Sequence, residues 1–282
     1  MDDFDFTQFP DFPELFPDLS DDLFDQPVTE DQDGIIECPF LATRDMVLFP
    51  QMVMPLFVGR ERSLAAINAA NKSRENLIVA AQRDNNIADP KEVDLFAIGT
   101  EASIGRILRM PDDTTSVLAQ GRRRVEILGF TQWDPYIRVR ARIVEEIGSW
   151  QPNTEALMRA VLALFEKVVD LNYNLPEETY TYALNLDEPG WLADFIASTL
   201  PVPVSTRQEV LEILDSHERL QTISILLARE LEVLELEGEI QSQVQQEVDR
   251  SHREHFLREQ MRIIQGELGE LDVFVQELVE LQ

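Results

Sequence analysis

Several features that define common classes of protein are missing from this 282-residue sequence. It contains a single cysteine, Cys38, which excludes an internal disulfide and is typical of a reducing compartment. No apolar run approaches the roughly 20 residues that span a bilayer. The amino terminus has neither a basic n-region nor an apolar h-region, so we expect no signal peptide. These absences predict a cytoplasmic protein that does not enter membranes.

Positive charge is also scarce, because 24 Lys and Arg residues face 53 Asp and Glu residues and the net charge is −29. Such a balance keeps a chain soluble and opposes broad binding to nucleic acid or to anionic membranes. One tight basic cluster occurs, Arg122-Arg123-Arg124. It could contact a nucleic-acid phosphate, but we favour pairing with some of the acidic side chains or with a neighbouring chain. We therefore do not expect this region to bind nucleic acid.

The sequence also lacks common catalytic motifs: it has no Gly-x-x-x-x-Gly-Lys-Ser/Thr phosphate loop and no Gly-x-Ser-x-Gly elbow. Cys38 has no histidine close in sequence, so we assign it no catalytic role. His252 and His255 would share one face of a helix, where Glu259 could complete a metal site. Without another strong ligand, a solvated face is the interpretation we favour. We predict no catalytic residue, no metal site and no cofactor in this chain.

Residues 1–37 form an acidic segment with thirteen Asp and Glu residues and no Lys or Arg. Its aromatic residues are Phe4, Phe6, Phe9, Phe12, Phe16 and Phe24. Prolines 10, 13 and 17 prevent a continuous helix. A disordered acidic tail is the simplest interpretation. Two alternatives stay open: an interaction tail that docks into apolar grooves, and an intramolecular lid over the protein's own binding surface.

From Cys38 onward the composition changes to short segments rich in Val, Ile, Leu and Phe, separated by Gly, Pro, Asp or Asn. This pattern predicts strands. The seven predicted strands are residues 40–43, 52–58, 77–81, 97–108, 115–119, 123–130 and 136–146. One helix, residues 61–71, interrupts them, and Asp112-Asp113 after Pro111 predicts a hairpin turn. Residues 38–150 are therefore expected to form a compact β-barrel-like domain.

The apolar period changes from two to 3.6 beyond Thr154, which predicts helices. A small bundle is expected over residues 151–215, with helices at 157–168, 176–186, 189–200 and from about Ser205. Asp215-Ser216 offers an N-cap for a last helix, residues 216–282, which no proline interrupts. If it runs unbroken to Leu268, it spans roughly 80 Å. A helix of that length cannot bury itself against a small domain, so it must reach towards something else.

Two sets of apolar residues are candidate contacts. Segment 48–57 is either core strand and turn or an adaptable apolar surface for varied peptides, since methionine is flexible and polarisable. The candidate substrate contacts are Phe49, Met52 and Met110. On the long helix a three-four alternation has the period of a coiled-coil seam that would pair with sister helices. The candidate seam residues are Leu257, Met261, Ile264 and Leu268.

Six stretches resemble, in the right order, the amino-terminal region of the Lon protease family, and together they span about residues 39–270. The first, residues 43–60, is TRDMVLFPQMVMPLFVGR. The others are residues 98–100 (IGT), 121–124 (GRRR), 186–194 (LDEPGWLAD), 227–234 (LARELEVL) and 252–270 (HREHFLREQMRIIQGELGE). The acidic segment 1–37 and the end beyond Glu270 depart from the family pattern.

The resemblance implies an α+β fold, with a PUA-like β-domain followed by a helical bundle and a long helix. It implies that this region captures unfolded or damaged proteins and helps to order a hexamer. In Lon, further domains hold ATP and Mg and cut substrates with a Ser-Lys dyad. Those domains are missing from this sequence, so we expect no catalysis by the chain alone. A free-standing adaptor or peptide-binding protein without proteolytic activity is the alternative function, and RNA binding by the PUA-like domain is a third, which the acidic charge opposes.

Overall fold

The computed structural model describes residues 34–109, 115–148 and 153–280, with the side chains of the long helix described as far as Ile264. The strands are β1 (Ile35–Thr43), β2 (Val53–Val58), β3 (Leu77–Ala81), β4 (Ile98–Arg109), β5 (Thr115–Gln132) and β6 (Arg138–Ile143). The helix α1 (Glu61–Ser73) lies between β2 and β3, and a short 3-10 helix, η3 (Glu92–Asp94), precedes β4. The remaining helices are α2 (Thr154–Leu171), α3 (Glu177–Leu184), α4 (Pro189–Thr199), α5 (Val204–Glu212) and α6 (Ser216–Glu280).

The six strands form one sheet in the order β2-β5-β4-β3-β1-β6, and an additional pairing between β5 and β6 closes it into a barrel. β5 makes the closure possible because it is 18 residues long. Its first part pairs with β2 and its last part pairs with β6, while β4 pairs with residues 115–126. The β1–β3 pair is parallel and the other pairs are antiparallel. The predicted barrel-like α+β fold is confirmed.

Two of the seven predicted strands, 115–119 and 123–130, are one strand, β5. The gap between these two predicted strands contains Gly121, which pairs with Ala102 of β4, and the ladder continues past it. The glycine serves a close backbone approach instead. Its N–H donates to the carbonyl oxygen of Met52 at 2.8 Å, and a Cβ at Gly121 would lie 2.1 Å from the carbonyl oxygen of Phe49. β1 also begins five residues before the predicted start, at Ile35.

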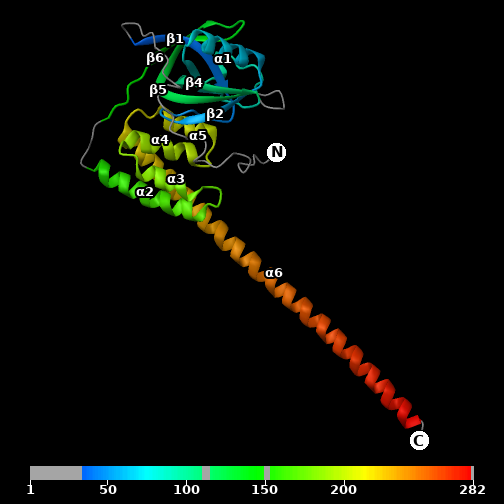
Figure 1. The fold of residues 1–282 in the computed structure, drawn as a ribbon. Helices are drawn as coiled ribbons and strands as arrows, with labels where there is room; N and C mark the ends of the chain where they lie inside the picture. Colours follow the sequence, from blue (N-terminus) through cyan, green and yellow to red (C-terminus); the bar gives the residue numbers. More distant parts are fainter. Residues whose placement is uncertain (1–33, 110–114, 149–152, 281–282) are drawn as a thin grey trace.

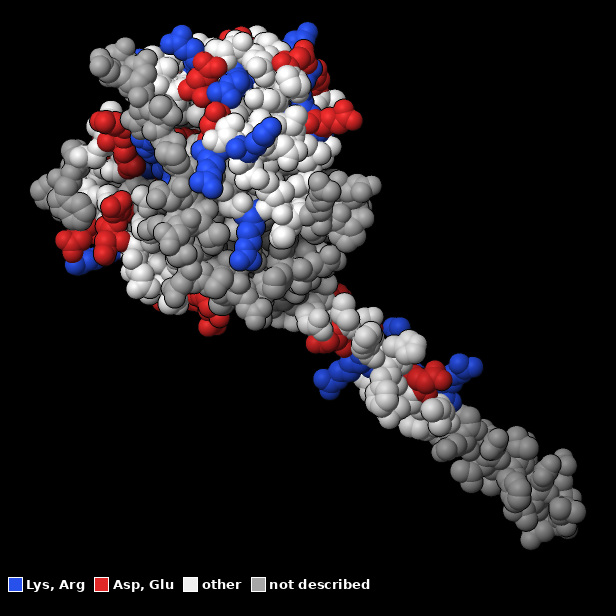
Figure 2. All heavy atoms as spheres, turned by 45° about the horizontal axis from the view of Figure 1, so that its top comes forward, with Lys and Arg blue, Asp and Glu red and all other residues white. Residues whose placement is uncertain are grey.

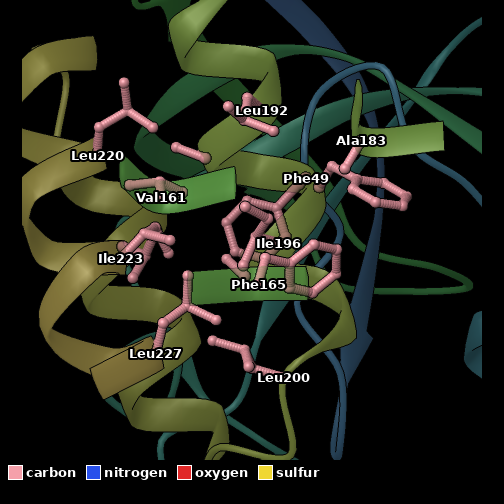
Figure 3. Close-up of a cluster of buried hydrophobic side chains, with 14 of the residues drawn as sticks. Phe49, Val161, Phe165, Ala183, Leu192, Ile196, Leu200, Leu220, Ile223 and Leu227 are labelled. Atoms are coloured by element: carbon pink, nitrogen blue, oxygen red, sulfur yellow. The ribbon is translucent and has the colours of Figure 1, made fainter. Parts of the chain in front are cut away.

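The helical half lies against one end of the barrel, with α4 and α5 next to the strands (Figure 1). Its buried side chains come from α2, α3, α4, α5 and α6 and belong to the same apolar cluster as Phe49 from the sheet half. In Figure 3, Phe49 lies among Phe165 of α2 and Ile196 of α4. The two halves therefore share one core across their junction.

The long helix α6 leaves this core as a projecting rod (Figure 1). Asp215 caps it, because the N–H groups of His217 and Glu218 donate to Asp215 Oδ1 at 2.8 and 3.0 Å. Its 65 residues correspond to about 100 Å. The first turns are buried in the bundle, but beyond Leu234 every described side chain of α6 is exposed. In the described part of the chain, no helix has the length and apolarity to cross a membrane.

Candidate functional site

A buried group of charged side chains fixes the junction between the halves. Nη2 of Arg124, on β5, donates to both carboxylate oxygens of Asp194, on α4, at 2.7 and 2.9 Å. Nε of Arg124 donates to the carbonyl oxygen of Leu211 at 2.9 Å. The sheet half is thus tied to two helices by one guanidinium group.

The base of α6 joins the same group through Arg219, which is fully buried. Its Nη1 donates to Asp194 Oδ1 at 3.1 Å, and its Nε donates to the carbonyl oxygen of Ile213 at 2.9 Å. Burial lowers the pKa of Arg219, and the charge of Asp194 opposes that effect. Glu146 supplies a second carboxylate, 3.5 Å from Arg219 and 3.9 Å from Arg124. Two positive and two negative groups therefore hold the direction in which α6 leaves the molecule.

Two residues of the basic cluster, Arg123 and Arg124, pair with acidic side chains of the protein, as we favoured. Besides Arg124, Arg123 donates from Nε to Glu101 Oε2 at 2.8 Å, and Arg122 donates from Nε to Ser103 Oγ at 2.7 Å. Asp194 lies in the stretch 186–194 that carries the resemblance, but its ion-pairing role had no signal in the sequence, because its partners lie 70 and 25 residues away.

Of the two interpretations of segment 48–57, the structure supports core strand and turn, and it does not place the candidate contacts Phe49 and Met52 on an open apolar surface. Phe49 is fully buried and Met52 is 8% exposed, both in the core shared by the two halves. The loop before β2 reaches the helices because Gly121 allows its backbone to approach β5 closely. The third candidate, Met110, lies outside the described residues.

An open, partly apolar surface lies instead beside α6. A groove of about 420 Å³ runs between α6 and residues 202–209, which are the end of the preceding loop and the first turns of α5. Its apolar lining is Val202, Pro203, Ile225, Leu226 and Val233. Its polar lining is Thr206, Glu209, Thr222, Arg229 and Glu230.

The polar groups of the groove stand beside its apolar lining, and the partial burial that results changes the pKa of Glu230. Burial raises the pKa of Glu230, and the nearby charge of Glu237 adds to the shift. The groove can therefore offer apolar contact together with hydrogen-bonding groups. Sequence reasoning missed it because its two walls come from segments about 20 residues apart that have no common pattern.

An exposed apolar stripe continues from the groove along α6. Val233, Leu236, Ile240 and Val244 are each at least half exposed and recur every three or four residues. From Ile225 to Val244 the path covers roughly 29 Å of helix. A long, extended ligand could therefore contact the groove and the stripe together.

The predicted seam residues lie further out on the same helix. Leu257, Met261 and Ile264 are 51%, 60% and 54% exposed, so they are open to a partner. Leu268 lies within α6, but its side chain is outside the described part. His252, His255 and Glu259 lie nearby, and among the described residues no three His, Cys, Asp or Glu side chains are grouped to hold a metal ion.

Comparison with known proteins identifies the class that this fold and junction define. A family model described as "ATP-dependent protease La (LON) substrate-binding domain" matches residues 37–229, and the chain belongs to this family. A solved structure, the "N terminal domain of Mycobacterium avium complex Lon protease", has the same fold with a TM-score of 0.56 and 22% identity. It matches 68% of this chain and 98% of its own.

Curated relatives give a closer match in sequence. "Lon protease 2" of Herpetosiphon aurantiacus is 47% identical over 246 residues, which are 87% of this chain. "Lon protease" of Dictyoglomus thermophilum is 40% identical over 244 residues, 86% of this chain. The chain spans only about 30% of the length of these relatives. The resemblance inferred from the sequence is thus confirmed, and the matched part is the substrate-binding region.

Proposed function

We propose that this chain captures unfolded or damaged proteins for a Lon protease by holding apolar segments in the groove beside α6. The observation that supports this proposal is the connection between the groove and the exposed apolar stripe. Val233 belongs to both, and the stripe continues along α6 to Leu236, Ile240 and Val244. A folded protein keeps its apolar side chains inside, whereas an unfolded chain presents them in series along an extended backbone. A groove that continues into an apolar stripe is therefore expected to bind the unfolded form of a protein more tightly than the folded form.

Capture at one such surface is weak, because each groove takes only a few side chains. Several copies held together would bind one long substrate at several points and gain strength through effective concentration. We propose that the exposed residues Leu257, Met261 and Ile264, together with Leu268, hold sister helices together in such an assembly. A hexamer in the full-length protein, as the family resemblance implies, would supply six grooves.

The rest of the activity is assigned to the parts of the relatives that this chain does not span. We propose that the chain alone neither hydrolyses ATP nor cuts peptides, and that ATP, Mg and the serine endopeptidase site belong to those other parts. The rod α6 would hold the groove at a distance from them. The single buried cysteine, Cys38, supports the cytoplasm as the place of action.

The test compares binding of an unfolded and a native form of one protein. Reduced, carboxymethylated lactalbumin and native lactalbumin are labelled with a fluorophore and titrated with the full chain, and fluorescence anisotropy is measured. We expect tighter binding of the unfolded form. Replacing both Ile225→Ser and Val233→Ser should weaken it by roughly thirtyfold, since each side chain contributes on the order of 1 kcal/mol of apolar contact.

The matched control is Leu184→Ser on α3, because Leu184 is 51% exposed and Ile225 is 54% exposed. This control should leave affinity unchanged. Equal affinity for the native and unfolded forms would contradict capture. An equal loss in the control and in the groove variant would contradict the groove as the site.

A further inference from the structure

The outer face of the barrel carries a second apolar surface, where β2, β5 and β4 lie side by side. Phe57 of β2 pairs with Ser116 of β5, which pairs with Leu108 of β4. Phe57 is 44% exposed and Leu108 is 58% exposed. In the next row, Pro55 pairs with Leu118, and both are half-buried. We call these four apolar residues, with Arg106 and Arg122, the β2–β5–β4 face.

This face differs in charge from most of the protein. No Asp or Glu occurs in the three strand segments that form it, which are Val53–Val58, 102–109 and 115–125. These segments include Arg122 and the exposed Arg106. Residues 38–148 carry 15 basic and 14 acidic side chains, counting Asp112 and Asp113 outside the described part, against an overall charge of −29. On the side seen in Figure 2, Lys and Arg side chains stand on a largely uncharged area of the sheet half.

One segment of the chain has the complementary chemistry. Residues 1–33 contain twelve acidic residues, six phenylalanines and no Lys or Arg. They lead directly into β1, which begins at Ile35. Fully extended, 33 residues reach up to about 110 Å, whereas a domain of this size has a radius of gyration of about 13 Å. The segment can therefore reach any point of the barrel.

We propose that residues 1–33 dock on the β2–β5–β4 face of their own chain. Phenylalanine rings pack on Phe57, Leu108 and Leu118, and neighbouring carboxylates lie beside Arg106 and Arg122. The tether gives an effective concentration in the millimolar range, so a weak site is enough. Exposed ion pairs contribute little individually and are screened by salt, so the docking is reversible and salt-sensitive.

This docking goes beyond the capture function, because it uses a different surface from the groove beside α6. Its consequence is a covered patch of apolar sheet that salt or a competing acidic, aromatic segment uncovers. The two proposals can fail separately, since the groove residues are not part of the β2–β5–β4 face.

The test follows cleavage of the tail by a small amount of chymotrypsin, which cuts after phenylalanine, using the full chain Met1–Gln282. Intact mass reports how fast residues from the first 33 are lost. Rates are divided by those of a free peptide of residues 1–33 at the same salt, which removes any effect of salt on the protease. We expect cleavage to be several-fold slower in the chain than in the peptide at 0.05 M NaCl, and equal at 0.5 M.

Two variants of the face, Arg106→Glu and Leu108→Ser, should each abolish most of the protection. Both side chains are exposed, so the fold is expected to survive, and a thermal melt checks this. The matched control is Leu128→Ser. Leu128 is also on β5 and is 47% exposed, but it lies in the part of β5 that pairs with β6 rather than with β2. About ten residues, or roughly 33 Å of strand, separate it from Leu118. This control should retain full protection.

Several outcomes would overturn the docking. One is equal cleavage of the chain and the free peptide at low salt. Another is unchanged protection in both face variants, or the same loss in Leu128→Ser. Loss of protection in Ile225→Ser would mean that residues 1–33 dock in the groove beside α6 instead. Protection that rises with protein concentration would show that a second copy, rather than the same chain, is the partner.

Discussion

Arg124 of β5 and Asp194 of α4 form an ion pair in which one nitrogen contacts both carboxylate oxygens, and each side chain is 3% exposed. The pair joins residues 70 positions apart. Asp194 also accepts a hydrogen bond from Arg219, so a single carboxylate serves two buried guanidinium groups from different elements. The stability of the junction and the direction of α6 therefore depend on the same residue.

The first prediction concerns removal of that charge. Asp194→Asn would leave Arg124 and Arg219 buried with only Glu146 as a carboxylate partner, and Glu146 is partly exposed. Breaking a buried pair in this way costs about 3–5 kcal/mol. Urea denaturation should show a loss of that size in the free energy of unfolding. In the control Asp89→Asn, which removes an exposed partner of Arg62, the loss should stay below about 1 kcal/mol. Similar losses in the two variants would contradict the junction's role.

The second prediction compares two glycines of β5. A Cβ at Gly121 would lie 2.1 Å from the backbone oxygen of Phe49, whereas a Cβ at Gly129 would meet nothing within 4 Å. Because a backbone atom cannot swing aside as a side chain can, Gly121→Ala should push the loop before β2 out of place. We expect a loss of about 1–3 kcal/mol in thermal or urea unfolding. Gly129→Ala should be close to neutral, and an equal loss in both would argue against the close approach.

Local patterns predicted most of the elements, because strand alternation and helix period depend on near neighbours. β3 and the start of α1 lie where the sequence placed them, and Asp215 caps α6 as expected. The division of β5 into two predicted strands around Gly121 was wrong for the same reason, because the role of Gly121 depends on a contact with Phe49, more than 70 residues earlier.

The candidate contacts were harder to predict because exposure is decided by distant parts of the chain. Phe49 is apolar in sequence whether it faces solvent or core, and only the arrival of α2 and α4 buries it. The seam residues Leu257, Met261 and Ile264 are exposed because nothing in the described chain folds back on that part of α6.

The third prediction concerns Cys38, whose thiol is buried in the barrel core. Burial, helped by the charge of Glu101, raises its pKa from 9.0 to about 12. At pH 8 the thiolate fraction is therefore roughly a thousandfold smaller than in the unfolded chain. Reaction with a disulfide reagent should be correspondingly slow in the native protein and fast after denaturation, with Cys38→Ser as the blank. A fast native reaction at pH 8 would contradict this.

The same shift makes stability depend on pH in the alkaline range. The folded state keeps the thiol neutral up to about pH 12, while the unfolded state ionises it above about pH 9. The contribution of Cys38 to stability is therefore complete below pH 9 and is lost as the pH rises from 9 towards 12. Urea denaturation at pH 8 and pH 10.5 should show a smaller decrease in Cys38→Ser than in the parent.

The last prediction concerns the outer part of α6, where Val233 and Met261 are 28 residues, or four heptads, apart. In a straight helix the two residues would be rotated by roughly 80° from one another, because each heptad drifts by about 20°. A left-handed supercoil would bring Val233, Leu236 and Ile240 into one seam with Leu257, Met261 and Ile264. The seam positions between them are polar: Gln243, Glu247, Arg250 and Glu254. Self-association should therefore depend mainly on the outer residues.

Met261→Lys and Ile264→Lys should each weaken self-association, because a charge in the seam must be desolvated without a partner. Sedimentation velocity at several protein concentrations measures the effect. The matched control is His252→Lys, which also adds a lysine to exposed α6 but lies nine residues, or about 180°, from Met261. It should leave association unchanged, and binding of unfolded lactalbumin to one chain should stay the same in all three variants. If Met261→Lys and Ile264→Lys sediment like the associated parent, the outer seam is not the contact between copies.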